Sequence, residues 1–363
     1  MSSASSIPPW NVRRPPRADG SVFLVTGGNA GIGYFVAEQL SATGATVVLG
    51  SRNPVKAEAA LASIRARVAG ARVRAVPLDL ADLSSLRSVV ESLGVECLDA
   101  VVHNAGVALD DPARRETEDG HELMFGTNHL GHFALTRWLM PLLSAAPAGR
   151  VVTMGSFAAK SERLDPDDLH SRKDYRPKRS YGRSKLAQMY FGVELDRRLR
   201  AVGAEVASVV VHPGGALDSL TPSRPPIHVR TARARLGAAP AAFLVQGKHA
   251  GAWPAVRAVL DPTVRGGQLW GPRVFGLRGE PRPEPVWNHL ADASVAARLW
   301  DASRDLTGVD PGAVLGQPLA RAHRVPAGHR PNHPPAESVT GTGPSPPRGG
   351  DGPVLGPPRR GRV

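Results

Sequence analysis

The sequence predicts an α/β fold in which one doubly wound parallel sheet of about seven strands carries helices on both faces. Short apolar runs rich in β-branched residues alternate with longer stretches of helical periodicity, without a break from Val22 to about Leu269. Strands and helices that alternate at these lengths are typical of parallel sheets with right-handed crossovers. A glycine-rich loop after the first apolar run agrees with this, because such loops join strand to helix where ligands bind these sheets.

The elements follow from the same patterns. The first strand is the apolar run 22–26, and the helix after it has Phe35, Val36 and Leu40 for its inner side. In chain order, strands are expected near 22–26, 46–50, 73–77, 98–103, 150–155, 205–211 and 267–271. Helices are expected near 31–43, 54–69, 83–93, 120–145, 180–202, 240–260 and 289–306. The unbroken alternation favours one domain over two.

Gly27, Gly31 and Gly33 form a G-x-x-x-G-x-G loop, which also contains Asn29 and Ile32, between the first strand and its helix. Glycine permits positive φ and lets a backbone approach a pyrophosphate, and the helix N-terminus offers N–H groups to it. The loop therefore predicts a dinucleotide site. The alternative is a tight turn without a ligand.

Tyr181 and Lys185 stand four residues apart, so on a helix they share one face. A free tyrosine has a pKa near 10, and a fixed positive charge beside it would lower that value and make the phenol an effective acid or base. The alternative is an exposed helix that carries an aromatic and a cation by chance. The rest of the chain favours the catalytic interpretation.

The chain resembles the short-chain dehydrogenase/reductases, which have a Rossmann-type fold, from about Gly20 to Val309. The matching motifs, in their order and spacing, are the glycine loop, Asp79-Leu80, Asn104-Ala105-Gly106, Asn128, Ser156, the Tyr181/Lys185 pair and His212-Pro213-Gly214. The run Asp119 to Phe133 and the long interval from Ser156 to Tyr181 are most similar to the retinol-dehydrogenase-like branch.

The resemblance implies a role for each matching residue. Tyr181 would exchange a proton with the substrate oxygen, and Lys185 would lower its pKa and hold the ribose of a nicotinamide cofactor. Ser156 would hydrogen-bond the carbonyl oxygen, and Asn128 would place a water that connects Lys185 to solvent, unless it only bonds locally. Cofactor contacts are expected from Gly27, Asn29, Gly31, Ile32, Gly33, Arg52, Asp79, Leu80, Asn104, Ala105, Gly106, Tyr181, Lys185, Pro213 and Gly214.

The end of the second strand favours NADP(H) over NAD(H). NAD enzymes place a carboxylate there for the ribose 2′-hydroxyl, whereas this chain has Ser51, Arg52 and Asn53. The guanidinium of Arg52 suits phosphate oxygens. The alternative is a solvated arginine at a strand end.

The chain departs from the family pattern at two places. Gly155 replaces a first serine, although Ser156 retains the hydroxyl. The loop after Gly214 lacks the usual threonine, for which Ser219 or Thr221 could substitute. The segment from Thr221 to Gly237, rich in proline and arginine, is where relatives build a substrate lid.

Residues 1–19 and 310–363 differ from the domain expected at 20–309. Both are rich in proline and arginine, a composition that buries too little apolar surface to offset the entropy of ordering, so both are expected to be disordered. The formal net charge is +13, and a basic tail can bind nucleic acid or an anionic surface. Because the tail lacks interleaved aromatic residues, nucleic acid is not an expected partner.

The remaining features favour a soluble cytoplasmic enzyme without a metal. Cys97 is the only cysteine, and no apolar segment approaches the roughly 20 residues of a membrane helix. His129 and His132 could meet His103 or His121 as metal ligands, but they belong to a family-like run whose relatives use no metal.

The favoured function is an NADP-dependent oxidoreductase that interconverts a carbonyl and an alcohol on a small, largely apolar substrate. Two alternatives remain open. One is a carbon–carbon double-bond reductase of the same fold. Such an enzyme would depend on a cysteine at a position that Cys97 does not occupy. The other is a non-catalytic dinucleotide-binding protein. By analogy with relatives, a homodimer or homotetramer would pair through the helices near 120–145 and 180–202.

Overall fold

The structure is a computed structural model that describes residues 10–229, 231, 233, 237 and 239–314. The chain divides into two units, Met1–Leu319 and Ala320–Val363, and the second lies wholly outside the described residues. The disorder expected of residues 1–9 and of the tail from 315 onward therefore concerns residues that the structure does not describe.

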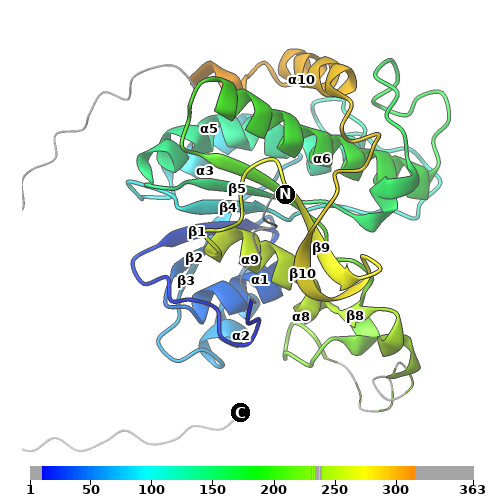
Figure 1. Cartoon of the computed structure of the whole chain (residues 1–363). Helices are drawn as coiled ribbons and strands as arrows, with labels where there is room; N and C mark the ends of the chain where they lie inside the picture. The colour runs from blue at the N-terminus through cyan, green and yellow to red at the C-terminus, as the bar shows by residue number, and fades with distance from the viewer. Residues whose placement is uncertain (1–9, 230, 232, 234–236, 238, 315–363) are drawn as a thin grey trace, which may run out of the picture. The chain divides into compact units, whose positions relative to one another are not determined.

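The first unit is built on a sheet of eight strands in the order β10-β9-β6-β5-β4-β1-β2-β3 (Figure 1). All neighbours are parallel except β10, which runs antiparallel to β9. The strands are β1 Val22–Thr26, β2 Thr46–Ser51, β3 Arg72–Pro77, β4 Ala100–His103, β5 Arg150–Met154, β6 Ala207–Val211, β9 Leu269–Val274 and β10 Arg278–Glu284. A second small sheet pairs β7 Ala216–Leu217 with β8 Gln246–Gly247. The predicted doubly wound α/β fold is confirmed.

Helices cover both faces of this sheet (Figure 1). The longer ones are α1 Gly31–Ser41, α2 Pro54–Arg65, α3 Leu86–Glu91, α5 Gly131–Ala145, α6 Pro177–Ala201, α9 Trp253–Leu260 and α10 Ala293–Thr307. Shorter turns are η1 Leu83–Ser85, α4 Leu123–Phe125, η2 Gly126–Leu130, η3 Phe157–Ser161, η4 Asp218–Leu220, η5 Ala239–Phe243, α8 Lys248–Gly251 and η6 Pro311–Val314. Side chains of α1, α2 and α9 form one buried cluster with the sheet, and those of α3, α5, α6 and α10 form the others.

Two predicted helices are interrupted. The helix expected at 120–145 begins only at Leu123, where the Glu122 carboxylate accepts the N–H groups of Met124 and Phe125, and it contains the π-helical turn η2. The helix expected at 240–260 is broken by β8, which pairs with β7, and by Pro254 at the start of α9. Tertiary pairing here overrides the helical periodicity.

The N-terminal segment is described from Trp10 onward, and there it lies against the domain. The Trp10 ring packs on the core, with the guanidinium of Arg257 at 5.5 Å from its centre. The N–H of Ala18 donates to the carbonyl of Thr43 at 3.0 Å. Residues 10–19 thus have contacts that their composition did not predict, because one partly buried tryptophan packs on the core.

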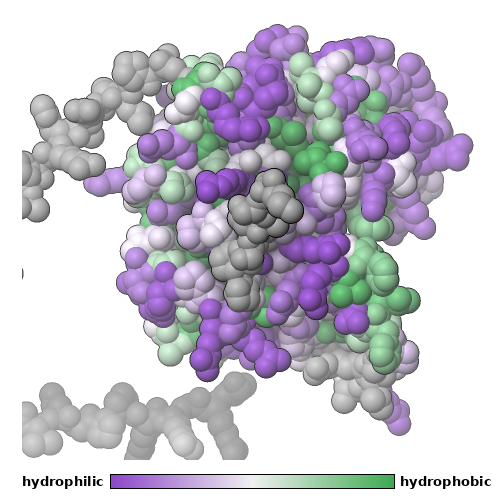
Figure 2. All heavy atoms as spheres, viewed as in Figure 1, coloured by the Kyte–Doolittle hydropathy of each residue, from purple (hydrophilic) through white to green (hydrophobic). Residues whose placement is uncertain are grey.

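Hydrophobic surface gathers over the part of the molecule that carries α8 and β8, while much of the same face is hydrophilic (Figure 2). Among the described residues, Phe243 and Leu244 are 78% and 65% exposed, and Phe275, at the β9–β10 turn, is 82% exposed. These apolar side chains belong to the segments that follow β6 and β9, beside the site described next.

Candidate active site

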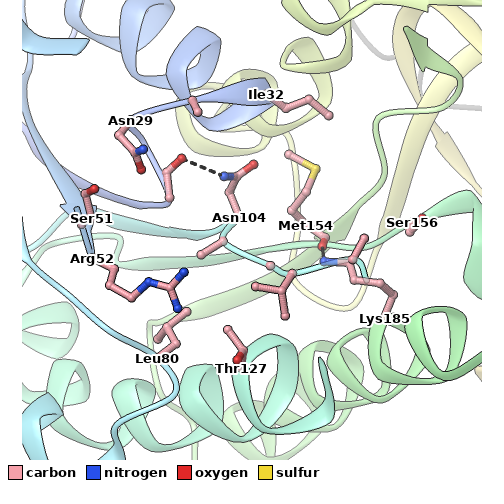
Figure 3. A pocket seen from close by; sticks show the side chains of 18 of the residues that line it. Asn29, Ile32, Ser51, Arg52, Leu80, Asn104, Thr127, Met154, Ser156 and Lys185 are labelled. Atoms are coloured by element: carbon pink, nitrogen blue, oxygen red, sulfur yellow. Dashed lines mark hydrogen bonds between the residues drawn. The ribbon is translucent and has the colours of Figure 1, made fainter. Parts of the chain in front are cut away.

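A cavity of about 580 Å³ lies at the carboxyl ends of the parallel strands (Figure 3). Most residues that the sequence predicted for the site line it. They are Gly27, Asn29, Gly31, Ile32, Arg52, Asp79, Leu80, Asn104, Ala105, Gly106, Ser156, Tyr181, Lys185 and Pro213. Asn128, Gly33 and Gly214 do not line the cavity.

The glycine loop opens onto this cavity. Gly27 and Gly31 have φ of +66° and +59°, a conformation that strains other residues. Gly33 is also required by packing, because a Cβ there would lie 2.3 Å from the Asn104 amide nitrogen and 2.4 Å from the Gly27 carbonyl oxygen. Ala30 precedes α1 and provides no side-chain cap, so the first N–H groups of the helix are open to an anion in the cavity.

Thr26 joins the glycine loop to the loop after β4. Its hydroxyl accepts the N–H groups of Asn104 and Ala105, each at 2.9 Å, and the Asn104 amide donates to the Thr26 carbonyl at 3.0 Å. The Thr26 hydroxyl also lies 2.9 Å from Nε2 of His132 on α5. These contacts hold Asn104 and Ala105 at the cavity wall.

Arg52 and Asp79 lie at one end of the cavity. The guanidinium of Arg52 is 3.8 Å from the Asp79 carboxylate, and its side chain remains 65% exposed. Ser51 and Leu78, which were not among the expected cofactor contacts, line the cavity beside them. Arg52 is therefore able to meet an anionic group without first losing a buried partner.

Tyr181 and Ser156 both line the other end of the cavity. Burial raises the pKa of Tyr181, and the hydrogen bond with the Ser156 hydroxyl offsets part of that rise. Ser156 in turn accepts the N–H of Ala158 at 3.2 Å, at the start of η3. At neutral pH the phenol is protonated and ready to donate.

Lys185 is buried on the same helix, and its ammonium donates to the Met154 carbonyl at 2.5 Å and to the Gln188 amide oxygen. Burial lowers the pKa of Lys185 to about 7. Lys185 is not among the groups that shift the pKa of Tyr181 in this structure, so the expectation that it lowers that pKa stays a prediction. The lysine is held by Met154 and Gln188, so burial of the phenol dominates.

Asn128 lies behind the cavity in the π-helical turn, fully buried. Its amide nitrogen donates to the Val107 carbonyl at 3.0 Å and to the Ser184 hydroxyl at 2.9 Å, and its amide oxygen accepts the N–H of Val107 at 2.7 Å. Asn128 thus fixes the loop after Gly106 to α6. Its role in placing a water stays a prediction.

The buried histidines have structural contacts. His129 lies 2.7 Å from the Ser303 hydroxyl, and His132 bridges Thr26 and the Asn128 carbonyl. Burial lowers the pKa of both rings to about 3. Within the described residues, no group of three or more His, Cys, Asp or Glu side chains is arranged to hold a metal ion.

The loop after β6 differs from what the sequence suggested for Thr221, which was expected as a possible substitute for the missing threonine. Thr221 is buried outside the cavity, where its hydroxyl donates to the Leu217 carbonyl and accepts the N–H of Lys248. Lys248 lines the cavity, and its ammonium pairs with the Asp218 carboxylate at 2.8 Å. Lys248, Thr127, Met154, Val107 and Ala108 were all missed by sequence reasoning.

Comparison with known proteins agrees with this geometry. The family model for short chain dehydrogenases matches residues 21–167. Mouse polyprenol dehydrogenase is 38% identical over 305 residues, which cover 82% of this chain and 87% of that protein. Human retinol dehydrogenase 13 is 35% identical over 306 residues, which cover 83% and 89%.

The chain belongs to the short-chain dehydrogenase/reductase family. Within it, the similarity is to the retinol-dehydrogenase-like branch. A solved structure of the same fold, the Pseudomonas aeruginosa RhlG/NADP active-site complex, superimposes with a TM-score of 0.52 at 26% identity and covers 70% of this chain and 94% of that one.

The protein is therefore an oxidoreductase that acts on a small molecule, with a fold that binds a nicotinamide dinucleotide. The open N-terminus of α1, the glycine loop and the Tyr181–Ser156 pair around one cavity fit that group. In the described part of this short-chain dehydrogenase/reductase, no helix combines the length and apolar character needed to cross a membrane.

Proposed function

We propose that this protein is an NADP-dependent oxidoreductase that interconverts a carbonyl and an alcohol, with Tyr181 as the proton donor and acceptor. The observation that carries the proposal is that Tyr181 and Ser156 line the same cavity as the open N-terminus of α1. One end of the cavity thus suits a pyrophosphate and the other a reacting oxygen.

The residues at the reacting end of the cavity have different chemical roles. A nicotinamide held in this cavity would supply or accept the hydride. Tyr181, protonated at neutral pH, donates its proton to the substrate oxygen during reduction, and Ser156 donates a hydrogen bond to the same oxygen. Lys185 lies one helical turn away with a pKa of about 7, so it is able to exchange protons near neutrality.

Arg52 supports the choice of NADP. It lies after β2, at the place where NAD enzymes carry a carboxylate, and its guanidinium is exposed at the cavity wall. A planar guanidinium binds phosphate oxygens in pairs. The solved relative of Pseudomonas aeruginosa contains NADP, which agrees with the assignment.

The substrate that the comparisons favour is an apolar alcohol or its aldehyde. Relatives are named for polyprenol and retinol, both apolar alcohols. Phe243, Leu244 and Phe275, in the segments that follow β6 and β9, present exposed apolar side chains outside the cavity. The alternative of double-bond reduction finds no support, because Cys97, the only cysteine, does not line the cavity.

Substitution Tyr181→Phe tests the proposal. NADPH oxidation with retinal as the probe aldehyde should fall by about 10²-fold or more, because a general acid contributes roughly 10²–10⁴-fold. NADPH affinity, measured by fluorescence titration, should change less than about twofold, because the ring remains in place.

Tyr190→Phe is the matched control. Tyr190 lies on the same helix, and its hydroxyl donates to the His289 carbonyl away from the cavity. That variant should keep its turnover. A Tyr181→Phe enzyme with wild-type turnover would remove Tyr181 from the mechanism, and a wild-type protein that binds NADPH but reduces no aldehyde would favour a non-catalytic function.

A further inference from the structure

His212 is a buried imidazole at the end of β6, and both of its ring nitrogens are engaged. Nδ1 lies 3.3 Å from the backbone N–H of Gly214, and Nε2 lies 3.2 Å from the carboxylate of Glu284. The Gly214 N–H is a donor, so Nδ1 must accept. The ring proton is therefore on Nε2, where it is donated to Glu284.

Glu284 reaches His212 from the end of β10. Burial raises the pKa of its carboxyl group, but the hydrogen bond from His212 and the nearby charges of Lys160 and Arg282 outweigh it, so the pKa lies below its ordinary value. Glu284 is thus a charged acceptor at neutral pH, which favours the proton position on Nε2.

The fold leaves space for this pair. A Cβ on Gly271, in the neighbouring strand β9, would lie 2.2 Å from Nε2 of His212 and 2.6 Å from Oε1 of Glu284. The rings of Phe157 and Trp287 flank the imidazole at centroid distances of 6.1 and 5.9 Å. The imidazole is therefore held in one orientation.

The same hairpin of β9 and β10 also holds the next residue of the loop. The N–H of Gly215 donates to the carbonyl of Leu277, in the turn between the two strands, at 3.0 Å. Gly214 itself has φ of +67°, and a Cβ there would lie 2.5 Å from the same carbonyl oxygen. Two successive N–H groups after Pro213 are thus fixed by contacts that depend on this hairpin.

We propose that Glu284 is a positioning residue for the dinucleotide site, which acts through His212 to fix the Pro213-Gly214 loop at the nicotinamide end of the cavity. This inference rests on the proposed function. It assigns a role to β10, the antiparallel strand that lies outside the motifs of the sequence, and Pro213 is the loop residue that reaches the cavity.

Glu284→Ala should disorder this loop without touching the cavity. Without the carboxylate, the imidazole is free to carry its proton on Nδ1, which would then face the Gly214 N–H donor. NADPH binding should weaken about tenfold, the effect expected for a lost hydrogen bond to a charged group. Binding of 2′,5′-ADP, which contains the adenine end and its phosphate but no nicotinamide, should stay at the wild-type value.

Four further variants complete the experiment, which uses the full chain and isothermal titration with both probes. Glu280→Ala removes an exposed carboxylate from the same strand and should change neither affinity. Glu284→Gln retains an acceptor for Nε2 and should bind NADPH nearly as the wild type does. In a His212→Asn background, Glu284→Ala should add no further loss, because the link between the two residues is already broken.

Wild-type NADPH affinity in Glu284→Ala would overturn the proposal. Equal losses for NADPH and 2′,5′-ADP would also overturn it, because they would indicate a general defect in folding. If the wild-type protein binds neither probe, the proposed function fails as well, so the two failures are distinguishable.

Discussion

At the scale of single residues, Lys185 is the side chain whose environment differs most from expectation. Its ammonium is buried and held by the Met154 carbonyl and the Gln188 amide, with no carboxylate among these partners. Burial of a cation against neutral partners lowers its pKa, here to about 7. The folded protein therefore binds a proton at this position less tightly than the unfolded chain does.

This pKa predicts a pH-dependent stability. Between about pH 7 and the ordinary lysine value, the unfolded chain keeps the proton that the folded protein has released, so stability rises with pH in this window. Relative to Lys185→Met, the wild type should gain roughly 1 kcal/mol of unfolding free energy per pH unit from pH 7 to 9. Urea denaturation of both proteins at three pH values measures it.

The variant itself serves as the control, because every other titrating group is common to both proteins. A difference between the two proteins that stays constant from pH 7 to 9 would show that Lys185 keeps an ordinary pKa in the folded state.

The site residues that belong to a short sequence motif could be predicted. Gly27, Asn104 and Tyr181 stand in segments whose spacing fixes their position relative to a strand end, and they line the cavity. Lys248 was not predictable, because its place depends on the pairing of β7 with β8 across an irregular segment. Gly33 packs closely against Asn104, and its expected contact with the cofactor stays a prediction.

At the scale of elements, Trp300 is a large buried contact between α10 and the rest of the domain. The indole is 2% exposed and packs at a centroid distance of 5.1 Å from Phe133 of α5 and 5.8 Å from Phe191 of α6. The guanidinium of Arg198 lies 4.3 Å from the ring centre. One side chain thus joins the last helix to two others.

Trp300→Ala should therefore lower the free energy of unfolding by about 3–5 kcal/mol, the usual loss for a large aromatic residue removed from a core. Chemical denaturation measures the change. Trp138→Ala is the control, because Trp138 is only partly buried on α5 and should cost less. A loss below about 1 kcal/mol for Trp300→Ala would mean that α10 is held by other contacts.

The elements that the sequence did not predict share a physical reason. β10 carries prolines at positions 281 and 283, which break the apolar alternation of an ordinary strand, and it tolerates them because it lies at the edge of the sheet. The break at Gly126–Leu130 arises from the π-helical turn, which no periodicity of 3.6 residues indicates. A short stretch of sequence indicates neither the long-range pairing of strands nor a local irregularity in a helix.

At the scale of the whole molecule, the fold of the domain was predictable from the alternation of strands and helices. Its boundaries at 20–309 stay a prediction. A homodimer or homotetramer through the helices near 120–145 and 180–202 also stays a prediction. α10 packs on α6 within the same chain, above the sheet in Figure 1, and occupies part of that helix surface.

A fluorescence titration of the full chain with NADPH and with NADH at one salt concentration, repeated on Arg52→Ala, is the decisive measurement of cofactor preference. We expect NADPH to bind more tightly than NADH, and the substitution to weaken NADPH binding much more than NADH binding, because only NADPH has a 2′-phosphate for Arg52. Tighter binding of NADH, or equal losses for both cofactors in Arg52→Ala, would contradict the NADP assignment. Binding of neither would contradict the dinucleotide site itself.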